Sequence, residues 1–108
     1  MGIELELRVK RARRGKAARG DTVVRGTHEH QDALARALDG VRRGRLGQVD
    51  PYRDTRFTEQ DAQVALAEVA ALVRECTEPS HRAALLDLAE LLEDCVATPG
   101  SCLWFIGD

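Results

Sequence analysis

The sequence has few aromatic residues: one tryptophan, one tyrosine and two phenylalanines among 108 residues. Proteins that bind RNA or single-stranded nucleic acid usually stack bases on several aromatic side chains. No aromatic residue falls within the most basic stretch, residues 10–20, so that signature is missing here. Leucine, alanine and valine must therefore fill most of the core.

Long apolar runs are also absent. Nowhere do 18 apolar residues follow one another, which argues against a membrane-spanning helix. The opening, Met-Gly-Ile-Glu-Leu-Glu-Leu, lacks the apolar stretch of a signal peptide. Apolar residues make up 44% and charged residues 31%, which is a globular balance. We therefore expect residues 1–108 to form a single domain in the cytoplasm, without membrane contact.

Cysteine is scarce and lysine scarcer. The three cysteines are an odd number without CxxC spacing, which favours free thiols in a reducing compartment. Only two of the 16 basic residues, Lys10 and Lys16, are lysines. With abundant alanine and leucine, this arginine bias indicates a GC-rich bacterial genome and says nothing about function.

Catalytic motifs are missing. The sequence has no GxGxxG, Walker loop, nucleophile elbow or HExxH. Cys76 and His81 could form a thiolate with its base, but Cys76 continues an apolar helical stripe, where cysteine acts as a small hydrophobe. We expect a protein with no catalytic residues, which is not an enzyme.

His28, Glu29 and His30 are the one segment that suggests a metal site. Residues two apart do not share a helical face, although the two histidines could converge if this segment were a strand. Zinc would still need one or two further ligands, and no spacing in the sequence recruits them. We therefore predict no metal ligands and no cofactor.

Regular patterns predict the strands and helices. Residues 3–9 alternate apolar and charged side chains, residues 22–25 suit a returning strand, and residues 102–106 are an apolar run. The last segment is either a strand covered on both faces or an edge that awaits a partner. Pairing of 102–106 beside 3–9 would tie the two ends of the chain together.

Three segments have helical periodicity. Thr27 is a candidate cap for a helix whose apolar face includes Leu34, Leu38 and Val41. A second helix begins at Thr58, with Asp61 at the capping-box position, and Pro79 suits the first turn of a third. Residues 44–56 are predicted to be a surface loop.

These elements predict an α+β fold in which about three helices pack on a small sheet formed by strands 3–9, 22–25 and 102–106. The two helices joined through residues 76–80 should be antiparallel neighbours, with their shared face on the sheet. Trp104 and Phe105 are both expected in the core, because aromatic residues are so few, although an exposed apolar edge is the alternative.

The charge is divided along the chain. Residues 1–56 have 14 Lys or Arg against 8 Asp or Glu, and residues 57–108 have 2 against 10, for a total of −2. We therefore predict a protein-interaction module that resembles small inhibitor proteins in size and charge. It would use its acidic half or its C-terminal strand to bind a protein partner or a second copy. The candidate contact residues are Glu90, Glu93, Asp94 and Trp104.

The alternative is nucleic-acid binding through the basic segment 10–19. Arginine side chains there could neutralise phosphates and release counterions. The candidate contacts are Arg11, Arg13, Arg14, Lys16 and Arg19. The same segment could instead be a solvated loop or an internal partner for the acidic helices.

Overall fold

The computed structural model describes residues 2–10, 21–27 and 29–107. In chain order its elements are β1 (Ile3–Lys10), β2 (Asp21–Thr27), α1 (Gln31–Leu38), the short 3-10 helix η1 (Leu46–Gln48), β3 (Thr55–Phe57), α2 (Glu59–Glu75), α3 (Pro79–Ala97) and β4 (Ser101–Gly107). The α+β class is confirmed, as are the three predicted strands, each of which is slightly longer than its sequence pattern.

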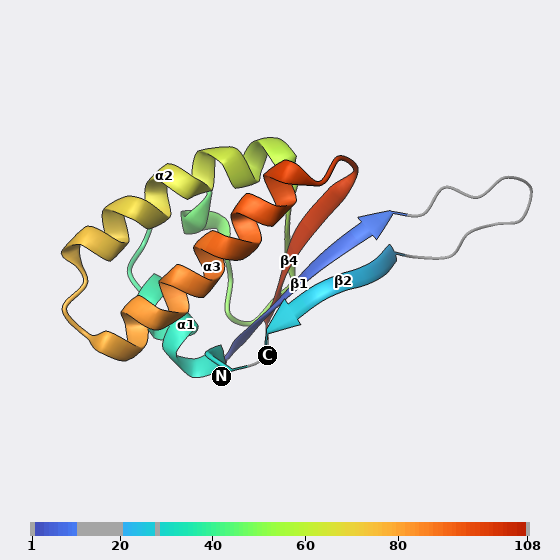
Figure 1. The fold of residues 1–108 in the computed structure, drawn as a ribbon. Helices are drawn as coiled ribbons and strands as arrows, with labels where there is room; N and C mark the ends of the chain where they lie inside the picture. The colour runs from blue at the N-terminus through green and yellow to red at the C-terminus, as the bar shows by residue number, and fades with distance from the viewer. Residues whose placement is uncertain (1, 11–20, 28, 108) are drawn as a thin grey trace, which may run out of the picture.

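The strands form one antiparallel sheet in the order β2-β1-β4-β3. β1 and β4 lie side by side at its centre, with Ile3 opposite Gly107 and Val9 opposite Ser101. The first and last described strands therefore meet, as predicted, and Figure 1 shows the two ends of the chain close together. β4 is a central strand and not an edge.

All three helices lie on one side of this sheet (Figure 1). Contacts join α1 and α3 to β1, and α2 and α3 to β4. On β1, Ile3, Leu5 and Leu7 are buried against the helices, whereas Glu6 and Arg8 point to the opposite side. The fold has two layers, and no described helix covers the second face of the sheet.

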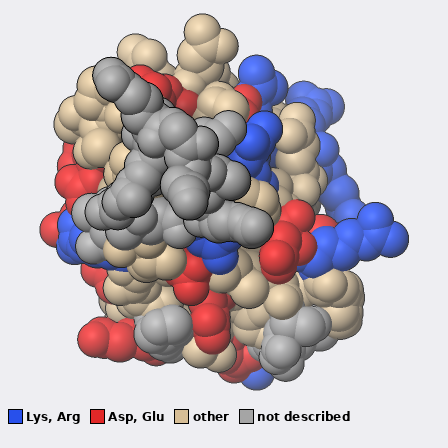
Figure 2. All heavy atoms as spheres, turned by 90° about the vertical axis from the view of Figure 1, so that its right-hand side faces the viewer, with Lys and Arg blue, Asp and Glu red and all other residues tan. Residues whose placement is uncertain are grey.

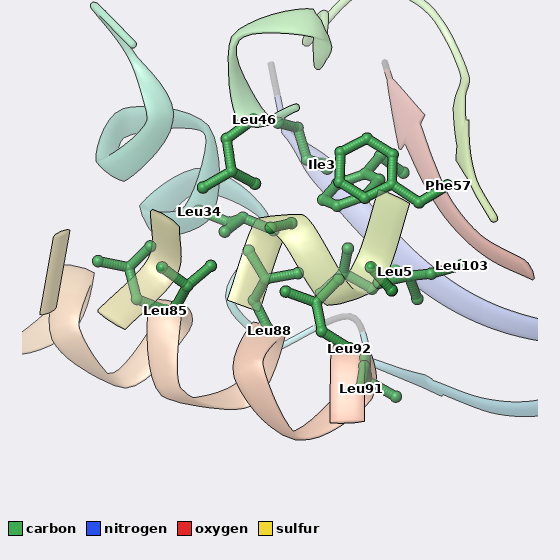
Figure 3. Packing of buried hydrophobic residues seen from close by; sticks show 14 of the residues in the cluster. Ile3, Leu5, Leu34, Leu46, Phe57, Leu85, Leu88, Leu91, Leu92 and Leu103 are labelled. Atoms are coloured by element: carbon green, nitrogen blue, oxygen red, sulfur yellow. The ribbon is translucent and has the colours of Figure 1, made fainter. Parts of the chain in front are cut away.

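The core lies between the helices and the sheet (Figure 3). Leucine supplies most of it, and two aromatic side chains close one end. Phe57 on β3 and Phe105 on β4 are fully buried, with ring centroids 4.6 Å apart and planes tilted by 57°. This tilted arrangement is one that aromatic pairs prefer. The prediction that Phe105 belongs to the core is therefore confirmed.

The start of α2 follows the predicted capping box. The Thr58 side chain accepts a hydrogen bond from the Asp61 backbone, and the Asp61 carboxylate accepts one from the Thr58 backbone. Two amides that the first helical turn cannot satisfy are thereby paired. α2 and α3 make extensive contacts across their short connection, and Figure 1 shows them running side by side in opposite directions.

Two sequence predictions were wrong in this region. α1 begins at Gln31 with His30 as its N-cap, and the proposed cap Thr27 is the last residue of β2. Residues 44–56 are not simply a surface loop, because they include η1 and the start of β3, and Leu46 is 1% exposed. Leu46 belongs to the buried hydrophobic core.

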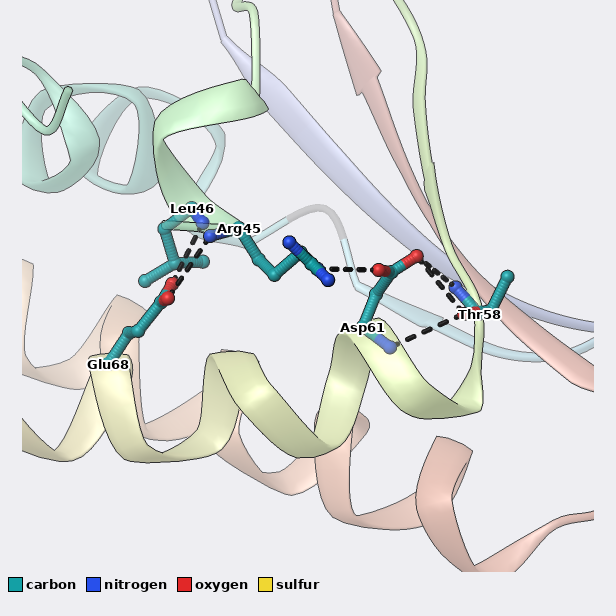
Figure 4. Close-up of polar contacts among 5 residues, drawn as sticks. All are labelled: Arg45, Leu46, Thr58, Asp61 and Glu68. Carbon is teal, nitrogen blue, oxygen red and sulfur yellow. Dashed lines mark hydrogen bonds and ion pairs between the residues drawn. The ribbon is translucent and has the colours of Figure 1, made fainter. Parts of the chain in front are cut away.

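A carboxylate on α2 holds this connection in place (Figure 4). Glu68 accepts hydrogen bonds from the backbone amides of Arg45 and Leu46, at 3.1 and 2.9 Å. The Arg45 side chain donates to Asp61 at 2.7 Å. Gly44 has a φ of +70°, and a Cβ atom at this position would overlap the Glu68 carboxylate. The loop therefore depends on a glycine at position 44 for conformation and for space.

Within the described parts of the chain, no helix combines the length and the apolar character that crossing a bilayer requires.

Candidate interaction surface

The sheet face opposite the helices is the most unusual surface of the protein. We call it the open face and define it by Val23 of β2, Glu6 and Arg8 of β1, Arg56 of β3, and Cys102, Trp104 and Ile106 of β4. In β4 the neighbouring residues Ser101, Leu103 and Phe105 are buried under the helices. The apolar run 102–106 thus supplies two apolar faces, but the described helices cover only one of them.

Trp104 is therefore not a residue of the main core, contrary to the sequence prediction. Its side chain lies on the open face, beneath Arg8, whose guanidinium carbon is 4.9 Å from the ring centroid. A guanidinium at this distance is attracted to the indole ring by a cation–π interaction. The Trp104 Nε1 atom is buried and makes no hydrogen bond to any described residue.

Arg8 is held over the ring by Glu6. Its Nε and Nη2 atoms both donate to Glu6 Oε1, at 2.9 and 2.6 Å. Side chains two apart on a strand share a face, which is why the alternation of β1 brings these charges together. Because both bonds go to Oε1, the second carboxylate oxygen of Glu6 keeps acceptor capacity.

Strand register places a charged residue on each side of Trp104. Glu6 of β1 is its partner on one side, and Arg56 of β3 is its partner on the other. Arg56 is exposed and forms no ion pair with a described residue. Glu6, Trp104 and Arg56 therefore form a row across the open face, which we call the acid–indole–base row. Sequence analysis missed Glu6, Arg8 and Arg56, although alternation and pairing with β1 could have found the first two.

The acidic residues of α3 have internal partners. Arg25 of β2 donates to Asp94 at 2.5 Å and lies 3.6 Å from Glu90. The pKa of Arg25 is raised, chiefly by its hydrogen bond to Asp94. Glu93 is exposed and lies apart from this cluster. Two of the three acidic residues predicted to bind a partner are thus engaged with β2, and only Glu93 is not.

Charge is unevenly spread over the end of the molecule seen in Figure 2. Acidic side chains gather on the left and lower parts of this view, and basic ones mainly on the right. The predicted phosphate contacts lie outside the described residues: Arg11, Arg13, Arg14, Lys16 and Arg19. Nucleic-acid binding through segment 10–19 therefore stays a prediction from the sequence.

A hollow of about 750 Å³ lies between α1 and residues 39–51. Its charged lining includes Asp32 and Arg36, which pair with each other at 3.3 Å. No histidine, cysteine or lysine belongs to the described lining. Its remaining charged residues are Asp39, Arg42 and Asp50.

Cys76 and His81 line a smaller hollow of about 310 Å³ at the connection between α2 and α3. The Cys76 thiol donates to the Glu78 carbonyl oxygen at 3.4 Å, and Arg82 donates to the Cys76 carbonyl oxygen at 3.1 Å. Among the described contacts no hydrogen bond joins the thiol to the imidazole. These bonds fasten the turn between the helices, and they do not orient a nucleophile.

His30 has a partner that the sequence did not indicate. Its Nε2 atom lies 2.8 Å from a carboxylate oxygen of Asp87 on α3, and the Glu29 carboxylate is close by. The two paired residues are 57 positions apart, so no local spacing could have revealed their contact.

Comparisons with protein-family models, with curated proteins and with solved structures gave no match.

Proposed function

We propose that this protein is a non-catalytic protein-interaction module that associates with a second copy of itself through the open face. The observation that carries the proposal is the position of Trp104, a large, partly exposed aromatic residue on the side of a central strand that no described helix covers. Tryptophan and arginine are the residues that most often dominate binding at protein interfaces. The open face has both, next to Ile106 and the 51%-exposed Val23.

The charges of the open face favour a second copy over a partner of one charge. A two-fold axis parallel to β4 and above Trp104 would bring the two Trp104 side chains, each beneath its own Arg8, to the centre of the interface. The same rotation would bring Glu6 of one copy opposite Arg56 of the other, and the reverse pair would form by symmetry. The acid–indole–base row is therefore complementary to itself, and the second oxygen of Glu6 is suited to accept from the opposing arginine.

The size of the face sets the expected strength. Four strands about 4.8 Å apart and up to eight residues long cover roughly 400 Å² per copy. Interfaces of this size are smaller than those of stable complexes and are typical of weak, transient association. We therefore expect a reversible dimer whose population depends on concentration in the micromolar to millimolar range.

Analytical ultracentrifugation over a concentration series tests this directly. The wild type should shift from monomer to dimer, and the emission of Trp104, the only tryptophan, should shift to shorter wavelength over the same range. R56E should weaken association about tenfold or more, because the new carboxylate of each copy would face Glu6 of the other copy. R74E, the same change at an exposed position on α2, is the matched control and should dimerise normally.

Mixing variants gives the decisive arm. R56E alone and E6R alone should both associate more weakly than the wild type, whereas an equimolar mixture should form a heterodimer because each new charge then meets its opposite. A wild type that stays monomeric at about 1 mM overturns the proposal. So does a dimer that R56E leaves unchanged, because its interface would lie elsewhere.

A further inference from the structure

We propose that Glu29, His30 and Asp87 form a binding site for a divalent transition-metal ion of the zinc type. Each residue offers one ligand atom, and the three atoms lie within 4.8 Å of one another. Two ligands come from the segment before α1 and the third from the middle of α3. The site is separate from the open face, and the inference is independent of the proposed self-association.

The ligand set suits this class of metal. One imidazole nitrogen and two carboxylate oxygens are ligands that zinc accepts at about 2.0–2.2 Å. In a tetrahedral site such ligands lie roughly 3.4 Å from one another. His30 and Asp87 now stand 2.8 Å apart, and the third ligand atom is within 4.8 Å. Shifts of about an ångström in the side chains would complete three sides of a tetrahedron and leave one position for water.

Two of the three ligands are held by the fold. The His30 carbonyl oxygen accepts the first hydrogen bond of α1, from Leu34 at 2.7 Å, which fixes the backbone at this position. Asp87 lies in the middle of α3, between the buried residues Leu85 and Leu88. The side chains of His30 and Asp87 are 25% and 38% exposed, so an ion could reach them. Glu29 is exposed, and its carboxylate oxygen lies within 4.8 Å of the other two ligand atoms.

The charge of the cluster itself suits a cation. Arg25 is near enough to Asp87 to interact with it electrostatically, but its hydrogen bond goes to Asp94 and Glu90 lies 3.6 Å from it. Asp87 lies 2.8 Å from the His30 Nε2 atom, which is the one ion-pair contact of Asp87 among the described residues. With a neutral imidazole, the Glu29 and Asp87 carboxylates would leave two negative charges, which a divalent ion would balance. An imidazole favours transition metals over magnesium or calcium, which prefer ligand sets made only of oxygen.

The test uses untagged protein freed of metal with a chelator. Zinc should bind with a stoichiometry of one by calorimetry and raise the thermal midpoint, because it binds only the folded state. Cobalt should give visible absorption typical of a four-coordinate site, and zinc should abolish it. Magnesium at the same concentration should do neither. H30Q, D87N and E29Q should each weaken zinc binding about tenfold or more.

Matched controls remove the same chemical groups elsewhere. H81Q and E93Q should bind zinc as tightly as the wild type, because neither side chain belongs to the cluster. Binding that survives D87N would overturn the inference, since the ion would then be held without α3. An absence of zinc or cobalt binding in the wild type would overturn it as well. If a variant fails to fold by circular dichroism, the conservative D87E variant, which keeps a carboxylate ligand, takes its place and should retain measurable binding.

Discussion

The carboxylate of Glu68 occupies the space that a side chain at Gly44 would need, and it accepts hydrogen bonds from the next two backbone amides. A single acidic residue on α2 thus determines how the chain leaves α1 and where Leu46 enters the core. Because Gly44 has a φ of +70°, a residue with a side chain would be strained there and would also displace the Glu68 carboxylate.

Replacing Gly44 by alanine should therefore destabilise the protein more than the same replacement at a left-handed glycine that has no close neighbour. G40A is the matched control, because Gly40 has a φ of +87° and a Cβ atom there would meet nothing within 4 Å. We expect about 1 kcal/mol for G40A and an additional 1–3 kcal/mol, roughly, for G44A through the displaced Glu68 bonds. Urea unfolding measures both, and equal losses would contradict the overlap.

A double variant separates the overlap from the hydrogen bonds. E68A alone should cost about 1–3 kcal/mol, because two backbone amides lose their acceptor. In the E68A and G44A double variant the clash is gone, so the loss should be smaller than the sum of the two single losses. Additive losses would indicate that the two residues do not interact.

Asp61 should contribute to the acid dependence of stability. Its pKa is lowered, first by the hydrogen bond from the Thr58 backbone, and further by the Thr58 side chain and Arg45. A carboxyl with a depressed folded-state pKa adds stability that is complete above its ordinary pKa near 4 and disappears as pH falls through the folded value. D61N should therefore lose stability at pH 7 and show a flatter decline below about pH 4.

The comparison is thermal unfolding of D61N and wild type between about pH 2 and pH 7. E93Q, which removes an exposed carboxylate on α3, is the control and should follow the wild-type profile. T58A should lower stability by about 1 kcal/mol at neutral pH through loss of the cap. A D61N profile that parallels the wild type would show that Asp61 does not carry this acid dependence.

The three cysteines should differ in reactivity. Cys95 is fully buried, and burial is the largest cause of its raised pKa, so its thiol stays protonated and shielded. Cys76 and Cys102 are partly exposed. Alkylation of the native protein followed by mass spectrometry should modify Cys76 and Cys102 and spare Cys95 until the protein is denatured. Rapid native labelling of Cys95 would contradict the packing of α3 on β4.

The pairing of Arg25 with α3 predicts a small effect that depends on salt. D94K and E90K should each lower the thermal midpoint by a few degrees in low salt, because each opposes Arg25 with a like charge. E93K on the same helix should have no such effect. The difference should shrink at about 1 M salt, where exposed charges are screened. Equal thermal midpoints for the three variants would show that Arg25 does not contribute to stability through Asp94 and Glu90.

Local patterns sufficed for much of the fold. The alternation in residues 3–9, the capping box at Thr58 and Pro79 at the first turn of α3 each identify an element through its own sequence. The predicted start of α1 was wrong because threonine is a common helix cap, whereas Thr27 belongs to the edge strand β2. β3 was missed because three residues are too few for a periodic signal, and it exists through pairing with β4.

The candidate sites depend on contacts that local patterns cannot encode. Trp104 was expected in the core because aromatic residues are scarce, but strand alternation turns it away from the helices and toward Arg8. Asp87 meets His30 only because α3 packs beside α1. Sequence could identify the residue types, whereas register and helix packing decided which of them are neighbours.

The central position of β4 beside β1 has a consequence for biosynthesis. Residues 3–10 must wait, with one edge unpaired, until residues 101–107 have been synthesised, since nothing else in the described chain takes that place. Closing so long a loop is a slow step. The sheet should therefore be completed only after translation has passed β4, and ribosome-bound chains that stop before Ser101 should remain sensitive to protease.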